Sequence, residues 1–128
     1  MSERTLVRCT GAGFGMTYNG MAIGLVLSFE MEPDGSISWT TPCLDTFDHD
    51  KNRRVGTAYG LDFLLQLLDV LGVEMVSELK GRYFYVLSAD PTGWGRSSES
   101  WTGFERLGMD GGKRLVFADV AAEWGLSP

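Results

Sequence analysis

Cysteine and histidine are scarce in this chain, which has two cysteines, Cys9 and Cys43, and one histidine, His49, in 128 residues. Neither cysteine has the close spacing of a metal or redox motif, so both are expected to be buried small side chains in a reducing compartment. A single histidine allows only one imidazole base, and no G-x-S-x-G pattern is present. These absences argue against a disulfide framework and against serine- or cysteine-type hydrolysis.

Basic residues are outnumbered by acidic ones, 11 against 17, and the formal net charge is −6. Nucleic-acid-binding proteins usually carry a basic stripe, so we expect no direct contact with nucleic acid, whereas a basic partner protein would suit this surface. The apolar stretch 21–29 is short and interrupted by Gly24 and Ser28, which argues against a membrane span. The first residues lack the apolar core of a signal peptide, and a cytoplasmic location is therefore expected.

The remaining composition, 44% hydrophobic and 22% charged, is that of a globular domain, and the length fits one domain over residues 1–128. Turn signals stand at Asn19-Gly20 and at Pro33-Asp34-Gly35. Apolar patterning predicts strands over 5–10, 21–31, 36–40, 82–88, 101–107 and 114–117. We therefore predict an α+β fold, in which an antiparallel sheet of about six strands (β-β-β-α-β-β) packs on one apolar helix, with a short helix at the C-terminus.

Two features refine the predicted sheet. Within 21–31, one face should point to the core because it is continuously apolar; its residues are Met21, Ile23, Leu25, Leu27, Phe29 and Met31. The glycine-rich segment 11–15 lacks the Lys-Ser/Thr ending of a phosphate loop, so it predicts a bulge or a close backbone approach in a strand.

Residues 59–71 are the clearest helix, with Thr57 as the expected N-cap and Gly72 as its stop. The predicted core stripe is Leu61, Leu64, Leu65, Leu68 and Leu71, with a second apolar strip of Phe63, Leu67 and Val70 beside it. Because such a helix is apolar around most of its circumference, it should be covered on more than one side. A homodimer through 59–71 would provide that cover.

The segment 41–56 shows no periodic pattern of apolar residues, which predicts an irregular loop. A loop of this length is often functional. Its Lys51, Arg53 and Arg54 could pair with phosphate or carboxylate. An alternative is a metal site, because carboxylates and imidazole bind divalent cations; the candidate ligands are Asp45, Asp48, His49 and Asp50. Their spacing matches no defined metal loop, and a solvated acidic turn offset by the following cations is the simpler interpretation.

The segment 89–103 combines aromatic side chains with a guanidinium, in Trp94, Arg96 and Trp101. Aromatic faces with arginine occur where proteins bind bases or nucleotides. The same residue types dominate contacts between proteins. An ordinary loop with Trp101 turned into the core is the third interpretation.

The stretch 59–117 resembles small proteins of unknown function encoded by tailed bacteriophages. In that group a helix leads through a pattern close to LGV-x-x-W-x-x-L-K-G into a strand. The matching residues are Leu71, Gly72, Val73, Leu79, Lys80 and Gly81, while Val76 stands where tryptophan is expected. The resemblance covers less than half of the chain and implies a phage or prophage origin, but no chemistry.

Taken together, these features predict a non-enzymatic, phage-encoded binding protein that inhibits a bacterial host protein by direct contact, as an anti-defence factor would. No cofactor is expected. The expected contact residues are Trp94, Arg96, Trp101, Lys51, Arg53 and Arg54. One alternative is a protein that sequesters a small anionic, nucleotide-like ligand, and another is a metal-dependent hydrolase that uses the His49 loop.

Overall fold

The computed structural model describes residues 3–17, 22–30, 35–42, 44–88, 101–108 and 112–126. The strands are β1 (Glu3–Thr17), β2 (Ala22–Glu30), β3 (Ser36–Thr40), β4 (Asp45–Asp48), β5 (Arg53–Gly56), β6 (Tyr83–Ser88), β7 (Trp101–Arg106) and β8 (Arg114–Val116). The helices are α1 (Ala58–Leu71), the single 3-10 turn η1 (Val76–Leu79) and α2 (Phe117–Glu123). The predicted Asn19-Gly20 turn lies outside the described residues.

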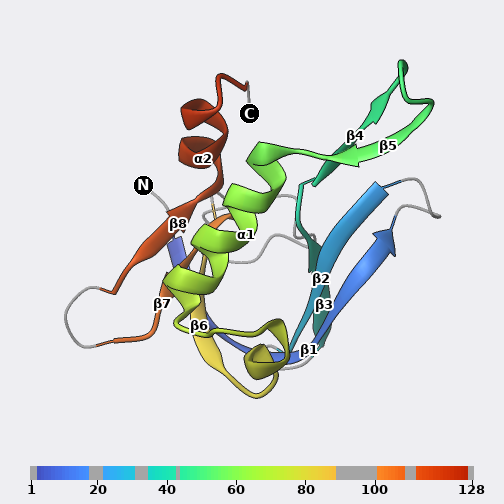
Figure 1. Cartoon of the computed structure of the whole chain (residues 1–128). Helices are drawn as coiled ribbons and strands as arrows, with labels where there is room; N and C mark the ends of the chain where they lie inside the picture. The colour runs from blue at the N-terminus through green and yellow to red at the C-terminus, as the bar shows by residue number, and fades with distance from the viewer. Residues whose placement is uncertain are drawn as a thin grey trace.

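Six strands form one antiparallel sheet in the order β3-β2-β1-β6-β7-β8. The helix α1 lies across one face of this sheet, and α2 lies beside the first turns of α1 (Figure 1). The predicted α+β fold is confirmed. The long strand β1 pairs with β6 through its first half and with β2 through its second half, and the register shifts between Cys9 and Gly11. The irregularity falls at Thr10, so the predicted bulge lies beside the glycine-rich segment 11–15, which itself pairs with β2 in continuous register.

Aromatic rings form the centre of the core between the sheet and α1. Phe29, Phe63 and Phe104 are fully buried, and the ring of Phe104 meets Trp39 edge-on at 4.8 Å between centroids. Leu25, Leu27 and Phe29 have no exposed surface, which confirms the predicted inner face of β2 for these residues. Cys9 is also buried, as expected, and burial raises the pKa of its thiol. Cys43 lies outside the described residues.

The ends of α1 form as its sequence predicts. The Thr57 hydroxyl accepts a hydrogen bond from the Gly60 amide at 2.9 Å, and Gly72 takes the left-handed conformation with φ of 75°. In the part of the chain that the structure describes, neither helix has the length and apolar character needed to cross a membrane.

The predicted core stripe of α1 is wrong for Leu61 and Leu65, whereas Leu71 is buried and Leu64 and Leu68 pack against the core while partly buried. Leu61 and Leu65 are 63% and 59% exposed, and the buried side of the helix comprises Gly60, Phe63, Leu67, Val70 and Leu71. The ring of Phe63 stacks on Trp39, so the bulkier aromatic strip faces the sheet. Apolar spacing alone did not distinguish two neighbouring strips that are equally hydrophobic.

The segment 41–56 is not the irregular loop that we predicted. Strands β4 and β5 pair from Asp45–Gly56 to Asp48–Arg53 and form a hairpin that extends from the domain (Figure 1). The Asp48 carboxylate closes its turn by accepting hydrogen bonds from the amides of Asp50 and Lys51. Because these strands are short and largely polar, they show no apolar alternation.

On the sheet face opposite the aromatic core, Glu105 lies between two arginines and is only 2% exposed. Its carboxylate oxygens accept from Arg4 Nη1 at 2.7 Å and from Arg114 Nε at 2.6 Å. Arg4 also lies over the ring of Tyr85, 4.5 Å from its centroid. Burial raises the pKa of the Glu105 carboxyl, but the two arginines outweigh it and the pKa lies below its ordinary value.

Replacement of Glu105 with glutamine is expected to lower the free energy of unfolding at neutral pH by about 1–3 kcal/mol, because two arginines then lose a buried anion. A depressed carboxyl pKa stabilises the folded state above the ordinary pKa, and this contribution is lost as pH falls through the folded-state pKa. Urea unfolding of Glu105→Gln should therefore depend less on pH below about 5 than unfolding of the unmodified protein. Glu30→Gln is the control, because Glu30 pairs with Arg8 in solvent; it should change stability by less than about 1 kcal/mol. Equal effects of the two variants would contradict this prediction.

Candidate binding groove

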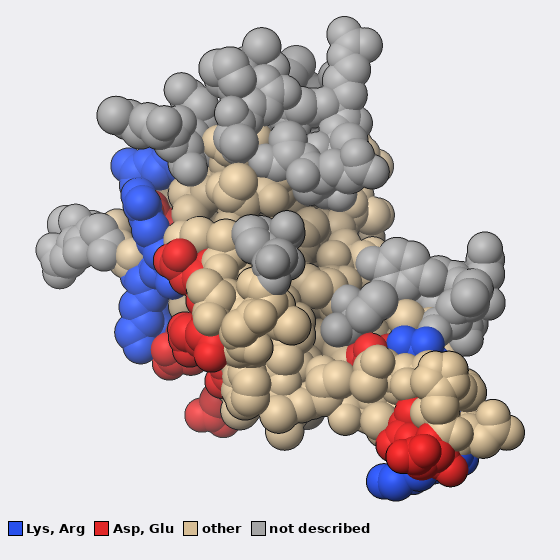
Figure 2. Space-filling model, turned by 90° about the horizontal axis from the view of Figure 1, so that it is seen from above, with Lys and Arg blue, Asp and Glu red and all other residues tan. Residues whose placement is uncertain are grey.

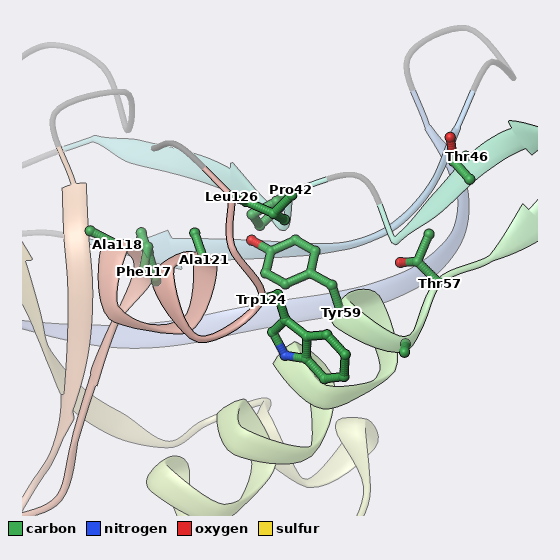
Figure 3. A pocket seen from close by; sticks show the side chains of 10 residues that line it. Pro42, Thr46, Thr57, Tyr59, Phe117, Ala118, Ala121, Trp124 and Leu126 are labelled. Atoms are coloured by element: carbon green, nitrogen blue, oxygen red, sulfur yellow. The ribbon is translucent and has the colours of Figure 1, made fainter.

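An open groove of about 880 Å³ lies between the start of α1, the helix α2 and the chain that follows β3. It is lined by Pro42, Thr46, Thr57, Ala58, Tyr59, Phe117, Ala118, Ala121, Trp124 and Leu126 (Figure 3). The described side chains of this lining carry no charge, and most of them are apolar. Volume and lining are both typical of a site that binds an apolar group.

One wall of the groove is held by hydrogen bonds at the start of α1. The amide and the hydroxyl of Thr57 both donate to the carbonyl of Leu44 at 3.1 Å. Gly60 allows this approach, because a Cβ there would lie 2.6 Å from the Leu44 Cα. The chain that carries Pro42 and Thr46 is therefore fixed against the first turn of the helix.

The other wall is α2 and the turn that follows it. Phe117 stacks on Trp39 of the core at 5.2 Å between centroids, which fixes the start of α2. At its end, the Trp124 indole donates to the Asp62 carboxylate of α1 at 2.9 Å. Trp124 and Leu126 remain 44% and 45% exposed, so this wall presents large apolar side chains to solvent.

Tyr59 is the main polar group inside the groove. Figure 3 shows its ring beside that of Trp124, with its hydroxyl directed toward Pro42 and Leu126. Burial raises the pKa of the Tyr59 hydroxyl, so this group stays protonated at neutral pH and can donate one hydrogen bond. The groove thus combines an apolar surface with the neutral hydroxyls of Tyr59, Thr46 and Thr57, and this arrangement does not suit an anion.

The predicted cationic residues are on the hairpin. Lys51 and Arg53 are exposed near its tip. Arg54 is instead turned to Asp45, with Nε to Oδ2 at 2.6 Å and Nη2 to Oδ1 at 3.0 Å. Since this pair is partly buried, Arg54 stabilises the hairpin and is a poorer candidate for an anion contact than we predicted.

The four candidate metal ligands do not converge. The Asp45 carboxylate pairs with Arg54, and this pairing lowers the pKa of the Asp45 carboxyl. The Asp48 carboxylate accepts hydrogen bonds from the turn amides. The His49 ring is exposed and lies against Phe47 at 4.9 Å between centroids. Over the described ranges, no three His, Cys, Asp or Glu side chains gather closely enough to hold a metal ion. These four side chains therefore do not form the metal site of the alternative interpretation.

Trp101 is not a surface contact. It is 5% exposed and packs on Phe29 at 5.3 Å between centroids, as in the alternative that turned this ring into the core. Trp94 and Arg96 lie outside the described residues, as does the rest of 89–100. Any contact that these residues make with the segment 41–56 is therefore outside the described structure as well.

Sequence reasoning missed the groove itself. Its walls come from residues far apart in the chain, such as Pro42, Tyr59 and Trp124, and none belongs to a motif. One signal was available: Trp124 and Leu126 flank a glycine at the end of a short helix, where core packing is scarce.

No family model, curated protein or solved structure matches this chain.

Proposed function

We propose that this chain is a non-catalytic protein that inhibits a bacterial partner protein by direct contact, and that the groove makes this contact. The observation that carries the proposal is the exposed apolar wall formed by Trp124 and Leu126 around a groove of about 880 Å³. Large exposed apolar surfaces mark interaction sites, and tryptophan is enriched among residues that dominate binding energy.

The biological setting is part of the same proposal. The resemblance of residues 59–117 to proteins of tailed phages supports a phage origin and a host partner in the bacterial cytoplasm, with an anti-defence role. The exposed position of His49, on a hairpin whose Asp45 and Asp48 carboxylates are already hydrogen-bonded, supports a binding function over a catalytic one.

Sequestration of a small ligand is the second proposal. The groove volume lies within the range of small-molecule sites. An anionic ligand would need Lys51 and Arg53, and the hairpin that carries them also contributes Thr46 to the groove. Native mass spectrometry of the protein purified from bacterial cytoplasm would show such a ligand as an added mass.

The substitution Ala118→Arg tests the contact. It places a long charged side chain at the groove from an exposed helical position, where arginine is well tolerated. We expect it to weaken binding of the host protein identified with the unmodified chain by at least about tenfold, measured with both purified components. Inhibition of that host protein should be lost in parallel.

Ala122→Arg is the matched control. Ala122 is exposed one turn after Ala118 on the same helix and does not line the groove, so this variant has the same charge and helix propensity at a position outside the lining. If Ala118→Arg binds as tightly as Ala122→Arg, the groove is not the contact site.

A further inference from the structure

The strand β1 has an open edge along its second half. It pairs with β6 over Glu3–Arg8 and with β2 over Arg8–Thr17. Along 12–17, therefore, no described strand pairs with the side of β1 that faces away from β2. In Figure 1 the arrowed end of β1 has β2 and β3 on one side and no described element on the other.

The backbone groups of Ala12, Phe14 and Met16 point to this open edge. Leu25 bonds on its β3 side, where its N–H donates to the Thr41 hydroxyl at 3.0 Å and its carbonyl accepts from the Thr41 amide at 2.9 Å. Directly opposite residues of an antiparallel ladder either exchange hydrogen bonds or both point away, and Leu25 is opposite Phe14. The N–H and carbonyl of Phe14 therefore point away from β2. Those of Ala12 and Met16, two residues before and after, point the same way.

The side chains of this edge are uncharged and apolar. Phe14 and Met16 are 55% and 57% exposed, because α1 packs on β7 and β8 toward the other end of the sheet. Open edges are usually protected by charged side chains, by proline or by a bulge within them. The stretch 12–16 contains no charge and no proline, and the bulge at Thr10 precedes it. An edge of this kind is suited to pairing with a further strand.

The two outer edges of the sheet are less suited to such a contact. The strand β3 carries hydroxyl side chains at Ser36, Ser38 and Thr40, and β8 is only three residues long. The second half of β1 is therefore the strand edge, among the described elements, that combines length with apolar side chains.

We infer that the open edge of β1 pairs with the same edge of a second copy of the chain, antiparallel and centred on Phe14. Phe14 then lies opposite the partner's Phe14, and Ala12 lies opposite the partner's Met16, so a small side chain meets a large one. The register provides roughly six backbone hydrogen bonds between the copies. This self-complementarity favours a second copy over an unrelated strand, and it gives the two-fold symmetry that is commonest among oligomers.

Charge does not oppose this contact, since residues 9–17 include no charged side chain. Charged side chains gather elsewhere, and on the face shown in Figure 2 they lie along its left side and at its lower right. Each copy carries a net charge of −6, so added salt should screen the remaining repulsion and strengthen the dimer.

The contact is short and buries on the order of 1,000 Å² in total, so we expect a weak dimer with a micromolar Kd. In dilute samples the chain is then a monomer, and unfolding measured there reports the isolated domain. The inference does not depend on the proposed function. It also places the dimer contact on β1, whereas the sequence predicted a contact through 59–71.

Sedimentation equilibrium from low micromolar to submillimolar concentrations tests the dimer. Phe14→Lys and Phe14→Glu each remove the ring and place like charges opposite one another at the two-fold axis, so each should weaken the dimer at least about tenfold. A mixture of the two variants should form a heterodimer, because opposite charges then face each other. Leu65→Lys is the matched control, since Leu65 is 59% exposed on α1 and should not affect dimerisation. Thermal unfolding checks that each variant keeps the fold.

Each contrary outcome has a distinct meaning. A protein that stays monomeric over the whole range overturns the inference and leaves the proposed function of the groove untouched. A dimer that Leu65→Lys dissociates and Phe14→Lys does not would assign the contact to α1. If the mixture of the two Phe14 variants stays monomeric, pairing centred on Phe14 is wrong. A monomeric protein that loses its host partner in Phe14→Lys would assign the edge to a strand of that partner.

Discussion

Replacing Phe104 with alanine is expected to lower the free energy of unfolding by about 3–5 kcal/mol, a large fraction of the stability of a typical domain. The Phe104 ring is fully buried and meets Trp39 at 4.8 Å, Phe84 at 5.3 Å and Phe117 at 5.5 Å between centroids. Its removal leaves a cavity whose walls come from β3, β6 and α2, so it cannot close by the movement of one element. Urea unfolding monitored by circular dichroism measures the change.

Two controls make this prediction specific. Phe104→Leu keeps most of the volume and should cost only about 1–2 kcal/mol. Phe14→Ala removes the same side chain from a site where it is 55% exposed, and it should change stability by less than about 1 kcal/mol. If Phe104→Ala were no more destabilising than Phe14→Ala, the aromatic cluster would not be the core of the domain.

Replacing Gly60 with alanine is expected to destabilise the protein by about 2–3 kcal/mol, although the same change stabilises most helix interiors by about 0.5–1 kcal/mol. A Cβ at Gly60 would collide with the carbonyl oxygen of Leu44 and lie 2.6 Å and 2.8 Å from its Cα and carbonyl carbon. All three are backbone atoms, so they cannot yield by rotation of a side chain. The segment that carries Pro42 would have to move away from α1, and partner binding should weaken as well.

Gly13→Ala is the matched control, because no atom lies within 4 Å of a Cβ added there. It should be neutral or slightly stabilising, through the lower entropy of the unfolded chain. Thermal unfolding of both variants gives the comparison. A Gly60→Ala protein at least as stable as the unmodified one would show that α1 and the Leu44 backbone are not in contact.

Much of the fold could be predicted because local signals and long-range packing agree. The alternation of Leu25, Leu27 and Phe29 identified an inner face, and Thr57 and Gly72 marked the ends of α1. The rotation of α1 could not be predicted, since two neighbouring strips were equally apolar and the stacking of Phe63 on Trp39 decided between them. The hairpin was missed because its stability comes from the Asp45–Arg54 pair and the Asp48 turn.

The candidate site was less accessible to sequence reasoning. Residues were chosen there for their chemical type, but Trp101 fills the core and Arg54 binds Asp45. The groove depends on the approach of Leu44 to α1 and on the hydrogen bond from Trp124 to Asp62, both of which join distant parts of the chain. A pattern within one segment carries no information about such contacts.

The strand β1 also determines the order in which the domain can be completed on the ribosome. Its second half can pair with β2 soon after synthesis, but its first half must wait for β6, which pairs Leu6 with Tyr85. Pairings between residues so distant in sequence close slowly. Until α1, β6 and β7 emerge, the nascent meander exposes Leu25, Leu27 and Phe29, and in that interval the chain is most open to aggregation and to capture by chaperones.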